Sequence, residues 1–558
     1  MKFRDTIRFA TFVVAVMLVC VLANLLSLRV DLTADKRYTL SEATKNLLRG
    51  LQEATYIKVY LDGEMPVGMR PLQRAVGDML SDMRAISDGL LRYDFVNPAE
   101  AKNKEQFYRE LMNRGLMPFT VQEKNAEGGV TQLDLFPCAE VNVGGRWQAV
   151  NFLQLNRQIS TEENVNNAIQ NMEYALASAV EALGRKERVS IAFVEGHGEL
   201  SAMQVADVME DLSAYYDVQR ITLHGDVHAL DSSALAVVAK STKAWSEADK
   251  LVVDQFVMRG GKMLWLVESV AVHEDSLANG HLTFGIPNEH NLHDMLFRYG
   301  VRINADVVQD LQCALIPVNM SPAGMPAKFS PMPWTYYPLL WPAASNPISR
   351  NLNVVKTEFP CTIDTLAVAG VSKEILLSTS AHSLVKKAPF YVSLEQVMED
   401  VDTRLFSHAQ LPVAVLLRGE FTSIFQHRVL SSFNHGQPFS FAAKSKPTAQ
   451  VVVADGDVIR NAVRANGDIL PLGYDQYTLQ PLYGNKEFVQ NVVSYLLDDK
   501  GLMSLRSKVV TMRLLDRSRV VNERRQWLVL NTLATLLLLG AGGVGFVMWR
   551  RIRYARTR

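Results

Sequence analysis

The sequence of 558 residues has few cysteines and lacks the motifs of several common enzyme classes. Its four cysteines are too few for a disulfide framework and show no C-x-x-C spacing. There is no G-x-S-x-G motif, and Gly260-Gly261-Lys262 lacks the earlier glycine and the following Ser or Thr of a phosphate-binding loop. These absences exclude a thiol redox pair, a hydrolase with that nucleophile motif and ATP hydrolysis through such a loop. We predict a chain without a catalytic residue, a metal or a cofactor.

The sequence also lacks an excess of charge of either sign. Lys and Arg together number 58, as do Asp and Glu, so the formal net charge is zero. Basic residues are dispersed outside the two termini and a stretch within residues 506–525. A nucleic-acid partner, which needs a basic surface, is therefore not expected. The basic stretch is typical of a solvated stalk near lipid headgroups, with a docking surface for a partner protein as the alternative.

Two long apolar runs lie near the ends of the sequence, at residues 9–28 and 527–549. Each has the length of about 20 residues that a helix needs to cross a membrane. Both short tails carry an excess of Lys and Arg, which favours the cytoplasm. We therefore expect a two-pass protein of a bacterial inner membrane, with both termini cytoplasmic and the intervening body periplasmic.

The first apolar run has two other interpretations. A cleaved signal peptide would use Val21-Leu22-Ala23 as its cleavage site, but apolar residues continue through Leu28. Lipidation of Cys20 is disfavoured, because Val19 is larger than the residue expected before a lipidated cysteine. An uncleaved membrane helix is the preferred interpretation.

The first half of the body alternates between strand and helix patterns. A capping box at Thr39-x-x-Glu42 predicts a short helix that ends at Gly50. The pattern then predicts strands at 56–61, 91–96, 119–122, 131–136 and 140–143, and helices at 69–86, 104–114 and 162–183. This order is that of a thioredoxin-like domain. Its redox chemistry is missing, because the turn after the first strand, at residues 63–66, contains no cysteine.

From Arg188 onward, strands and helices again alternate, which predicts a doubly wound α/β domain. The clearest helix is capped by Ser246-x-x-Asp249 and ends at Gly260-Gly261. Another helix is predicted at 486–497, with Asn485 as its cap. Residues 313–450 are rich in proline and short strand-like pieces, so we expect a β-rich insertion or extension there, before a buried strand returns at 451–454.

Two polar clusters are candidate ligand sites. Glu195-Gly196-His197-Gly198-Glu199 follows a buried strand, where open α/β sheets bind ligands, and its side chains suit a metal. The favoured interpretation is a tight turn, in which Gly196 and Gly198 supply positive φ and the polar residues cap the next helix.

Asp455-Gly456-Asp457 suits calcium, but the rest of an EF-hand pattern is absent, which favours a turn with capping carboxylates. His224 and His228 flank a loop and are expected at the surface.

Several segments resemble one protein family across nearly the whole chain, least between residues 317 and 450. They are Asp31-Leu32-Thr33, Arg37-Tyr38-Thr39-Leu40-Ser41 and the segments 193–199 (FVEGHGE), 257–266 (VMRGGKMLWL), 299–302 (YGVR), 455–461 (DGDVIRN) and 484–488 (GNKEF). Together they are similar to the GldG family, auxiliary proteins of gliding-motility-type ABC transporters. The large α/β domain also resembles the class I glutamine-amidotransferase-like fold. None of Cys138, Cys313 and Cys361 follows a predicted parallel strand as that activity requires.

The resemblance implies a noncatalytic, substrate-binding-like subunit that works with a separate permease and a separate cytoplasmic ATPase, and with periplasmic or secretion-machinery proteins. Gly540, Gly542, Gly543 and Gly545 in the second apolar run are expected to pack closely on a membrane helix. The alternatives are a membrane-anchored metal-dependent enzyme using Glu195, His197 and Glu199, and a purely structural tether.

These expectations divide the chain into consecutive parts. They are a cytoplasmic tail (1–8), a transmembrane helix (9–28), a juxtamembrane segment (29–55), the thioredoxin-like domain (56–185), the doubly wound domain in two parts (188–312 and 451–500) around the β-rich insertion or extension (313–450), a basic stalk (501–526), a second transmembrane helix (527–549) and a cytoplasmic tail (550–558).

Overall fold

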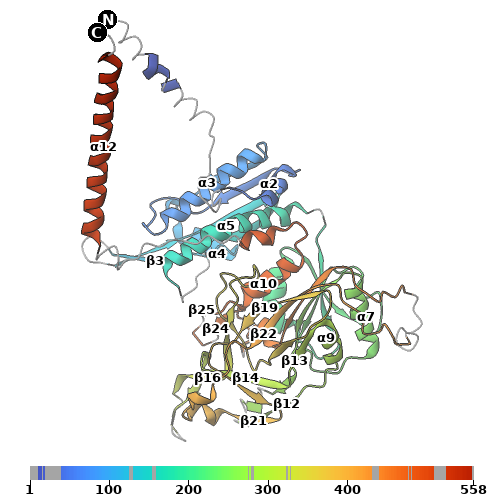
Figure 1. Ribbon diagram of the computed structural model, residues 1–558. Helices are drawn as coiled ribbons and strands as arrows, with labels where there is room; N and C mark the ends of the chain where they lie inside the picture. Colours follow the sequence, from blue (N-terminus) through green and yellow to red (C-terminus); the bar gives the residue numbers. More distant parts are fainter. Residues whose placement is uncertain are drawn as a thin grey trace. The chain divides into compact units, whose positions relative to one another are not determined.

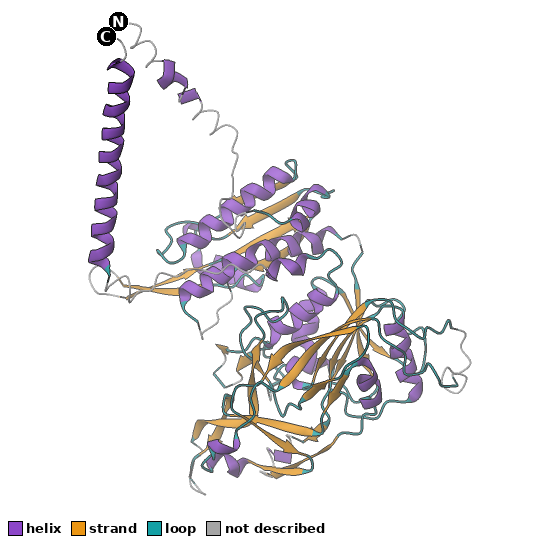
Figure 2. Cartoon of the chain, viewed as in Figure 1, coloured by secondary structure: helices purple, strands orange, loops and turns teal. Residues whose placement is uncertain are grey.

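A computed structural model shows a mixed α/β protein (Figures 1 and 2). It describes residues 11–15, 17–18, 39–124, 130–153, 159–185, 187–273, 276–277, 282–321, 325–326, 328–429, 439–464, 466–475, 477–478, 480–507 and 523–555. The segments 31–33 and 37–38, which contribute to the family resemblance, lie outside these residues.

The N-terminal region, residues 39–185, is built on a four-stranded mixed sheet. Its strands β1 (Thr55–Val59), β2 (Leu91–Phe95), β5 (Cys138–Val143) and β6 (Arg146–Asn151) lie in the order β2-β1-β5-β6. Strand β1 is parallel to β2 and antiparallel to β5, which is antiparallel to β6. Strands β3 (Phe119–Lys124) and β4 (Val130–Leu135) form a separate hairpin.

Four helices accompany this sheet: α2 (Glu42–Arg49), α3 (Arg70–Ile86), α4 (Lys104–Asn113) and α5 (Thr161–Gly184). Helix α5 begins with a capping box between Ser160 and Glu163, and its apolar side, including Met172, joins the core of this region. The predicted N-cap of α2 was wrong by two residues. The side chain of Ser41, rather than that of Thr39, accepts the backbone N–H of Thr44 in the first turn of the helix. The C-cap at Gly50 is confirmed.

The main region, residues 187–507, contains the largest sheet. Five parallel strands lie side by side in the order β23 (Thr448–Val453), β10 (Lys262–Leu266), β9 (Leu235–Ala239), β7 (Ser190–Glu195) and β8 (Asp217–Thr222). Figure 1 shows α7 (Glu247–Met258) and α10 (Asn485–Leu496) on opposite sides of this sheet. Every residue of β9 is buried, as expected for a parallel strand covered on both faces.

The same sheet continues beyond β23 with antiparallel strands. They are β22 (Pro412–Gly419), β19 (Val371–Ser378), β16 (Phe329–Pro342), β15 (Cys313–Asn319) and β17 (Val355–Lys356), which pairs with β16. Within the described residues, much of the proline-rich region therefore extends the main sheet.

Short elements complete the main region. They are α6 (Ala206–Ser213), α9 (His293–Tyr299), the sheet of β11 (Val270–Val272), β12 (Leu282–Pro287) and β21 (Phe390–Ser393), and the pairs β13 (Val301–Ile303) with β18 (Ile363–Thr365), β14 (Asp306–Asp310) with β20 (Ser383–Lys387) and β24 (Tyr474–Asp475) with β25 (Gln480–Pro481). The 3₁₀ turns are η1 (Pro98–Glu100), η2 (Ala202–Val205), η3 (Leu394–Met398), η4 (Thr403–Leu405), η6 (Asp457–Ile459) and η7 (Leu502–Ser507).

Helix caps in the main region were predicted with mixed success. The cap of α7 is confirmed, because the Ser246 side chain accepts the backbone N–H of Asp249. Asn485 is not the cap of α10. Its amide donates to the carbonyls of Lys356 and Val458, and its oxygen accepts the N–H of Lys356. It joins α10 to β17 and η6.

Helix α12 (Arg524–Ala555) belongs to a second compact unit, separate from the one that contains the two regions described above. Within the described residues, its span Arg524–Arg553 is the one helix long and apolar enough to cross a membrane, and none of that span is buried. The first apolar run is described only at residues 11–15 and 17–18, which are helical. The rest of that predicted crossing lies outside the described residues.

Candidate functional site at the carboxyl edge of the parallel strands

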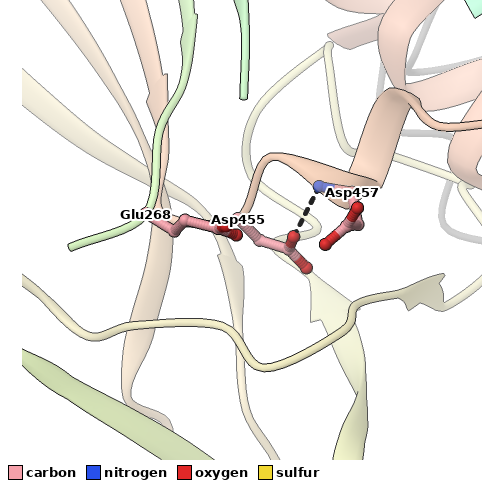
Figure 3. Close-up of side chains that lie close together, drawn as sticks. All are labelled: Glu268, Asp455 and Asp457. Atoms are coloured by element: carbon pink, nitrogen blue, oxygen red, sulfur yellow. Dashed lines mark hydrogen bonds between the residues drawn. The ribbon is translucent and has the colours of Figure 1, made fainter. Parts of the chain in front are cut away.

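Charged residues follow three neighbouring parallel strands; the three carboxylates are buried, and the lysine side chain is 16% exposed. Lys240 follows β9, Glu268 comes two residues after β10, and Asp455 and Asp457 follow β23. Because carboxyl ends of parallel strands meet at one edge of the sheet, these side chains lie together, and Figure 3 shows the three carboxylates side by side. We call them, with Lys240, the edge cluster.

Ionic and hydrogen bonds hold the edge cluster together. The Lys240 ammonium donates to Asp457 and lies 3.4 Å from Oε1 of Glu268. Asp455 accepts two backbone N–H groups, from Asp457 at 2.7 Å and from Glu358 at 2.8 Å. The first of these bonds closes a turn on Asp455, as expected for the Asp-Gly-Asp sequence.

Burial and mutual repulsion set the protonation of the carboxyls. Desolvation raises the pKa of both Glu268 and Asp455, and the nearby charge of Asp457 raises both further. Burial opposes the charge on Lys240, but Asp457 and Glu268 outweigh it and raise the pKa of this ammonium. Lys240 therefore stays charged, while Glu268 and Asp455 hold a proton more tightly than free carboxyls do.

The edge cluster has the donor atoms of a hard-cation site. One oxygen from each of Glu268, Asp455 and Asp457 lies within 4.8 Å of the others, and such oxygens suit Mg²⁺ or Ca²⁺. The Lys240 ammonium, however, already binds Asp457 and lies next to Glu268. Arg460 also pairs with Asp457, with 2.8 Å between its Nε and Oδ1 of the carboxylate. The arrangement is a largely buried ion network in which Lys240 and Arg460 provide the positive charge.

Sequence reasoning missed Lys240 and Glu268. Both stand just after apolar strands, the same position that drew attention to Glu195. Applying the strand-end rule to every parallel strand would have found them. The pairing itself depends on the order of the strands in the sheet, which the sequence pattern does not reveal.

His197 lies in a second group of charged residues, on the turn after β7. Its Nδ1 is 3.2 Å from Oε1 of Glu199, and its Nε2 is 3.1 Å from Oδ2 of Asp249 on α7. The ring stacks on Trp245, with 3.9 Å between the ring centres. Glu195 is separate from this group, because its carboxylate binds Arg220.

The turn needs both of its glycines. Gly196 and Gly198 have φ of +117° and +77°, values that L side chains rarely adopt. A Cβ on Gly198 would also meet the hydroxyl of Thr242. The predicted positive φ values are confirmed. The prediction that the polar residues of this turn cap the next helix is corrected, because Ser201 forms the capping box of η2 while Glu199 binds His197.

The surrounding carboxylates keep the imidazole charged. Burial disfavours the imidazolium, but hydrogen bonds to Asp249 and Glu199 outweigh it and raise the pKa of His197 to about 9. Burial alone would raise the pKa of Asp249, but the hydrogen bonds from His197, Ser246 and Gly225 outweigh burial and lower this pKa to about 2. An imidazolium donates both of its N–H groups and has no lone pair for a metal. His197 is suited to joining the turn to α7.

The comparisons with known proteins concern most of the described chain. A family model described as an ABC-type uncharacterized transport system matches residues 188–492, more than half of the sequence. The chain belongs to this family. A second match, at residues 34–142, is to a domain of unknown function. No curated protein matches the chain.

Two solved structures are similar to parts of this member of the ABC-type transport family, at low identity. The mmIFT52 N-terminal domain shares 14% identity over 55% of this chain and 97% of its own, with a TM-score of 0.31. Exo-beta-1,4-mannosidase Op5Man5 from Opitutaceae bacterium strain TAV5 shares 11% over 83% of this chain and 55% of its own, with a TM-score of 0.23.

In this member of the ABC-type transport family, the charged groups described above all lie within the family match. The edge cluster, His197, Asp249 and Trp245 fall between residues 188 and 492. Helix α12 falls outside it. Membership supports an accessory role in an ABC transport system and association with transporter components.

The four glycines of α12 have open space around them, because a Cβ on any of them would meet nothing within 4 Å. At about 100° per residue, Gly540 and Gly543 share one side of the helix, and Gly542 and Gly545 lie together on another. One helix neighbour can therefore use one pair at a time.

Proposed function

We propose that the chain is a noncatalytic accessory subunit of an ABC transporter, anchored in the inner membrane by α12 and by residues 9–28. A separate permease and a separate cytoplasmic ATPase are its partners, and the body lies in the periplasm. The observation that carries the proposal is the family match over residues 188–492 in a chain that also has the exposed apolar helix α12. The resemblance of the sequence to the GldG family supports, as part of this proposal, a transporter of the gliding-motility type.

The charged groups at the strand edge favour a noncatalytic role. In the edge cluster the carboxylates bind Lys240 and backbone N–H groups, and at His197 both ring nitrogens face carboxylates. A general base or nucleophile needs a group free to meet a substrate. The β2-β1-β5-β6 order supports a thioredoxin-like assignment for the N-terminal region, and the parallel strands of the main region support a glutamine-amidotransferase-like one.

Co-purification tests the assembly. The tagged full chain, extracted from host membranes in a mild detergent, is expected to bring down a permease and an ATPase in a fixed ratio by mass spectrometry. A chain that is recovered alone would contradict the proposal and support a purely structural tether.

Matched glycine variants show whether α12 makes the contact. Leucine at both Gly540 and Gly543, or at both Gly542 and Gly545, blocks close approach on one side of the helix at a time. We expect one double variant to reduce recovery of the permease severalfold and the other to leave it unchanged. Val544→Leu, on the same helix, is the control for added bulk. Equal recovery with all three variants would show that α12 only anchors the chain.

Reporter fusions test the orientation. Green fluorescent protein fused after Arg558 is expected to fluoresce, and alkaline phosphatase at the same position to be inactive, because the C-terminal tail carries an excess of arginine. Alkaline phosphatase fused after residue 507 is expected to be active. The reverse pattern of activities would place the body in the cytoplasm and overturn the topology.

A further inference from the structure

A cavity of ≈ 260 Å³ lies between the N-terminal region and the main region. Residues of β6 and α5 line it on one side, and residues of α6, α10 and η7 on the other. Its volume is near the lower end of small-molecule sites, which span about 300–1,000 Å³ and occur often where two layers of a protein meet. We call it the Arg506 cavity.

Arg506 is the unusual member of the lining. Its side chain is only 7% exposed, its Nη1 donates to Asn491 and its Nη2 donates to the carbonyl of Arg350 at 3.2 Å. The guanidinium lies 5.5 Å from the ring centre of Tyr174. Among the described residues, its Nε has no hydrogen-bond partner and no carboxylate forms an ion pair with it. A buried cation without a counter-ion is costly, and burial lowers its pKa.

The acids of the lining already have other partners. Glu181 binds Arg185 at 2.7 Å. Asp211 lies 3.5 Å from the Lys486 ammonium and binds Gln490. Asp498 accepts the backbone N–H groups of Leu502 and Met503. The positive charge of Arg506 is therefore unbalanced locally, while the acidic residues are not available to balance it.

The rest of the lining offers neutral hydrogen-bonding groups. The Nδ2 of Asn351 is buried without an acceptor within the described part of the chain. Burial raises the pKa of Tyr174 and raises that of Tyr216 to about 12, so both hydroxyls stay protonated and able to donate. Several further asparagine and serine side chains line the cavity. Such groups pair with the hydroxyls of a polar molecule.

We propose that the Arg506 cavity binds a small hydroxylated monocarboxylate, with the carboxylate on Arg506 and the hydroxyls on the amide and tyrosine side chains. The unpartnered Nε–H of the guanidinium and its unpaired positive charge match a monoanion. A phosphate dianion would add a surplus negative charge beside three acids. The inference goes beyond the accessory role, because a subunit that docks on a permease needs no ligand.

Binding to the full chain in mild detergent tests the cavity, by isothermal titration calorimetry with two probe pairs. Glucuronate and gluconate are expected to bind, while glucose and sorbitol, which lack the carboxylate, are expected to bind at least about tenfold more weakly. Hydrogen exchange of α5 and η7 is expected to slow only with the acids. No binding of either acid, equal binding of the neutral sugars, or tighter binding of inorganic phosphate would overturn the proposal.

Two variants locate the site. Arg506→Met is expected to weaken glucuronate binding by roughly tenfold or more, through loss of a charged hydrogen bond. Asn351→Asp keeps the guanidinium but adds a negative charge to the lining, so it is expected to abolish glucuronate binding. This second variant keeps the site testable if Arg506→Met does not fold. Asn351 has φ of +56°, which aspartate tolerates.

Arg404→Met, which changes an exposed arginine, is the control. Unchanged affinity in Asn351→Asp would contradict the assigned site. These readouts need no permease, so their failure leaves the accessory role standing.

Discussion

Replacing Lys240 by methionine is expected to lower the free energy of unfolding of the main region by roughly 3–5 kcal/mol, the cost of removing one partner from a buried ion pair. Lys240 neutralises Asp457 and lies beside Glu268, and both carboxylates are almost completely buried. Without the ammonium these acids repel each other in a medium of low dielectric constant. The loss should exceed that from any exposed ion pair, which is worth about 0–1 kcal/mol.

Amide hydrogen exchange of peptides from β9, β10 and β23 measures this loss in the full chain, since it reports the stability of one part of a multidomain protein. Lys262→Met is the matched control. Lys262 stands at the start of β10, is 25% exposed and lies 3.5 Å from the exposed Asp499. Adding Asp457→Asn to Lys240→Met should recover part of the loss, because it removes a carboxylate that has lost its ammonium partner and repels Glu268. Arg460, which also pairs with Asp457, keeps its ion pair with Glu358 in the double variant. Equal effects of Lys240→Met and Lys262→Met would show that the edge cluster is not a coupled network.

Local patterns in the sequence predict the helices and strands of this fold better than they predict which strands pair with one another. Helix α3, predicted at residues 69–86, and the Ser246 cap of α7 are both found where expected, because each depends on residues close in the chain. Strand β6 was missed, since its exposed and half-buried residues do not alternate clearly. The antiparallel strands β19 and β22 were seen as fragments, and their place beside β23 follows from pairing over long separations.

The same limit applies to the charged groups. The sequence singled out His197, Asp455 and Asp457, because each belongs to a conspicuous glycine turn. It did not reveal that Asp249, assigned only to a helix cap, also faces His197 across 52 positions of the chain. Lys240 and Glu268 stand in no recognisable motif. Which charges meet depends on strand order and helix placement, so partners could be predicted only after the topology.

The charged state of His197 predicts a loss of stability at alkaline pH. Its pKa is raised from about 6.5 in the unfolded chain to about 9 in the folded one, so the imidazolium contributes stability that is fully present below pH 6.5. This contribution is lost as the pH rises through 9. A shift of this size corresponds to about 3 kcal/mol, at 1.36 kcal/mol per pKa unit. Asp249 acts in the acid range, where its lowered pKa makes stability fall as the pH drops from about 4 to about 2.

Hydrogen exchange of β7 and α7, corrected for the intrinsic dependence of exchange on pH, is expected to show the alkaline loss between pH 6.5 and 9 in the full chain. His197→Gln should be less stable at pH 6.5, because glutamine cannot supply the positive charge between Glu199 and Asp249. Its stability should also change less over this range. His228→Gln is the matched control, since His228 is exposed and lies 2.6 Å from Asp231. A slope that persists unchanged in His197→Gln would mean that another group titrates there, and that folding does not raise the pKa of His197.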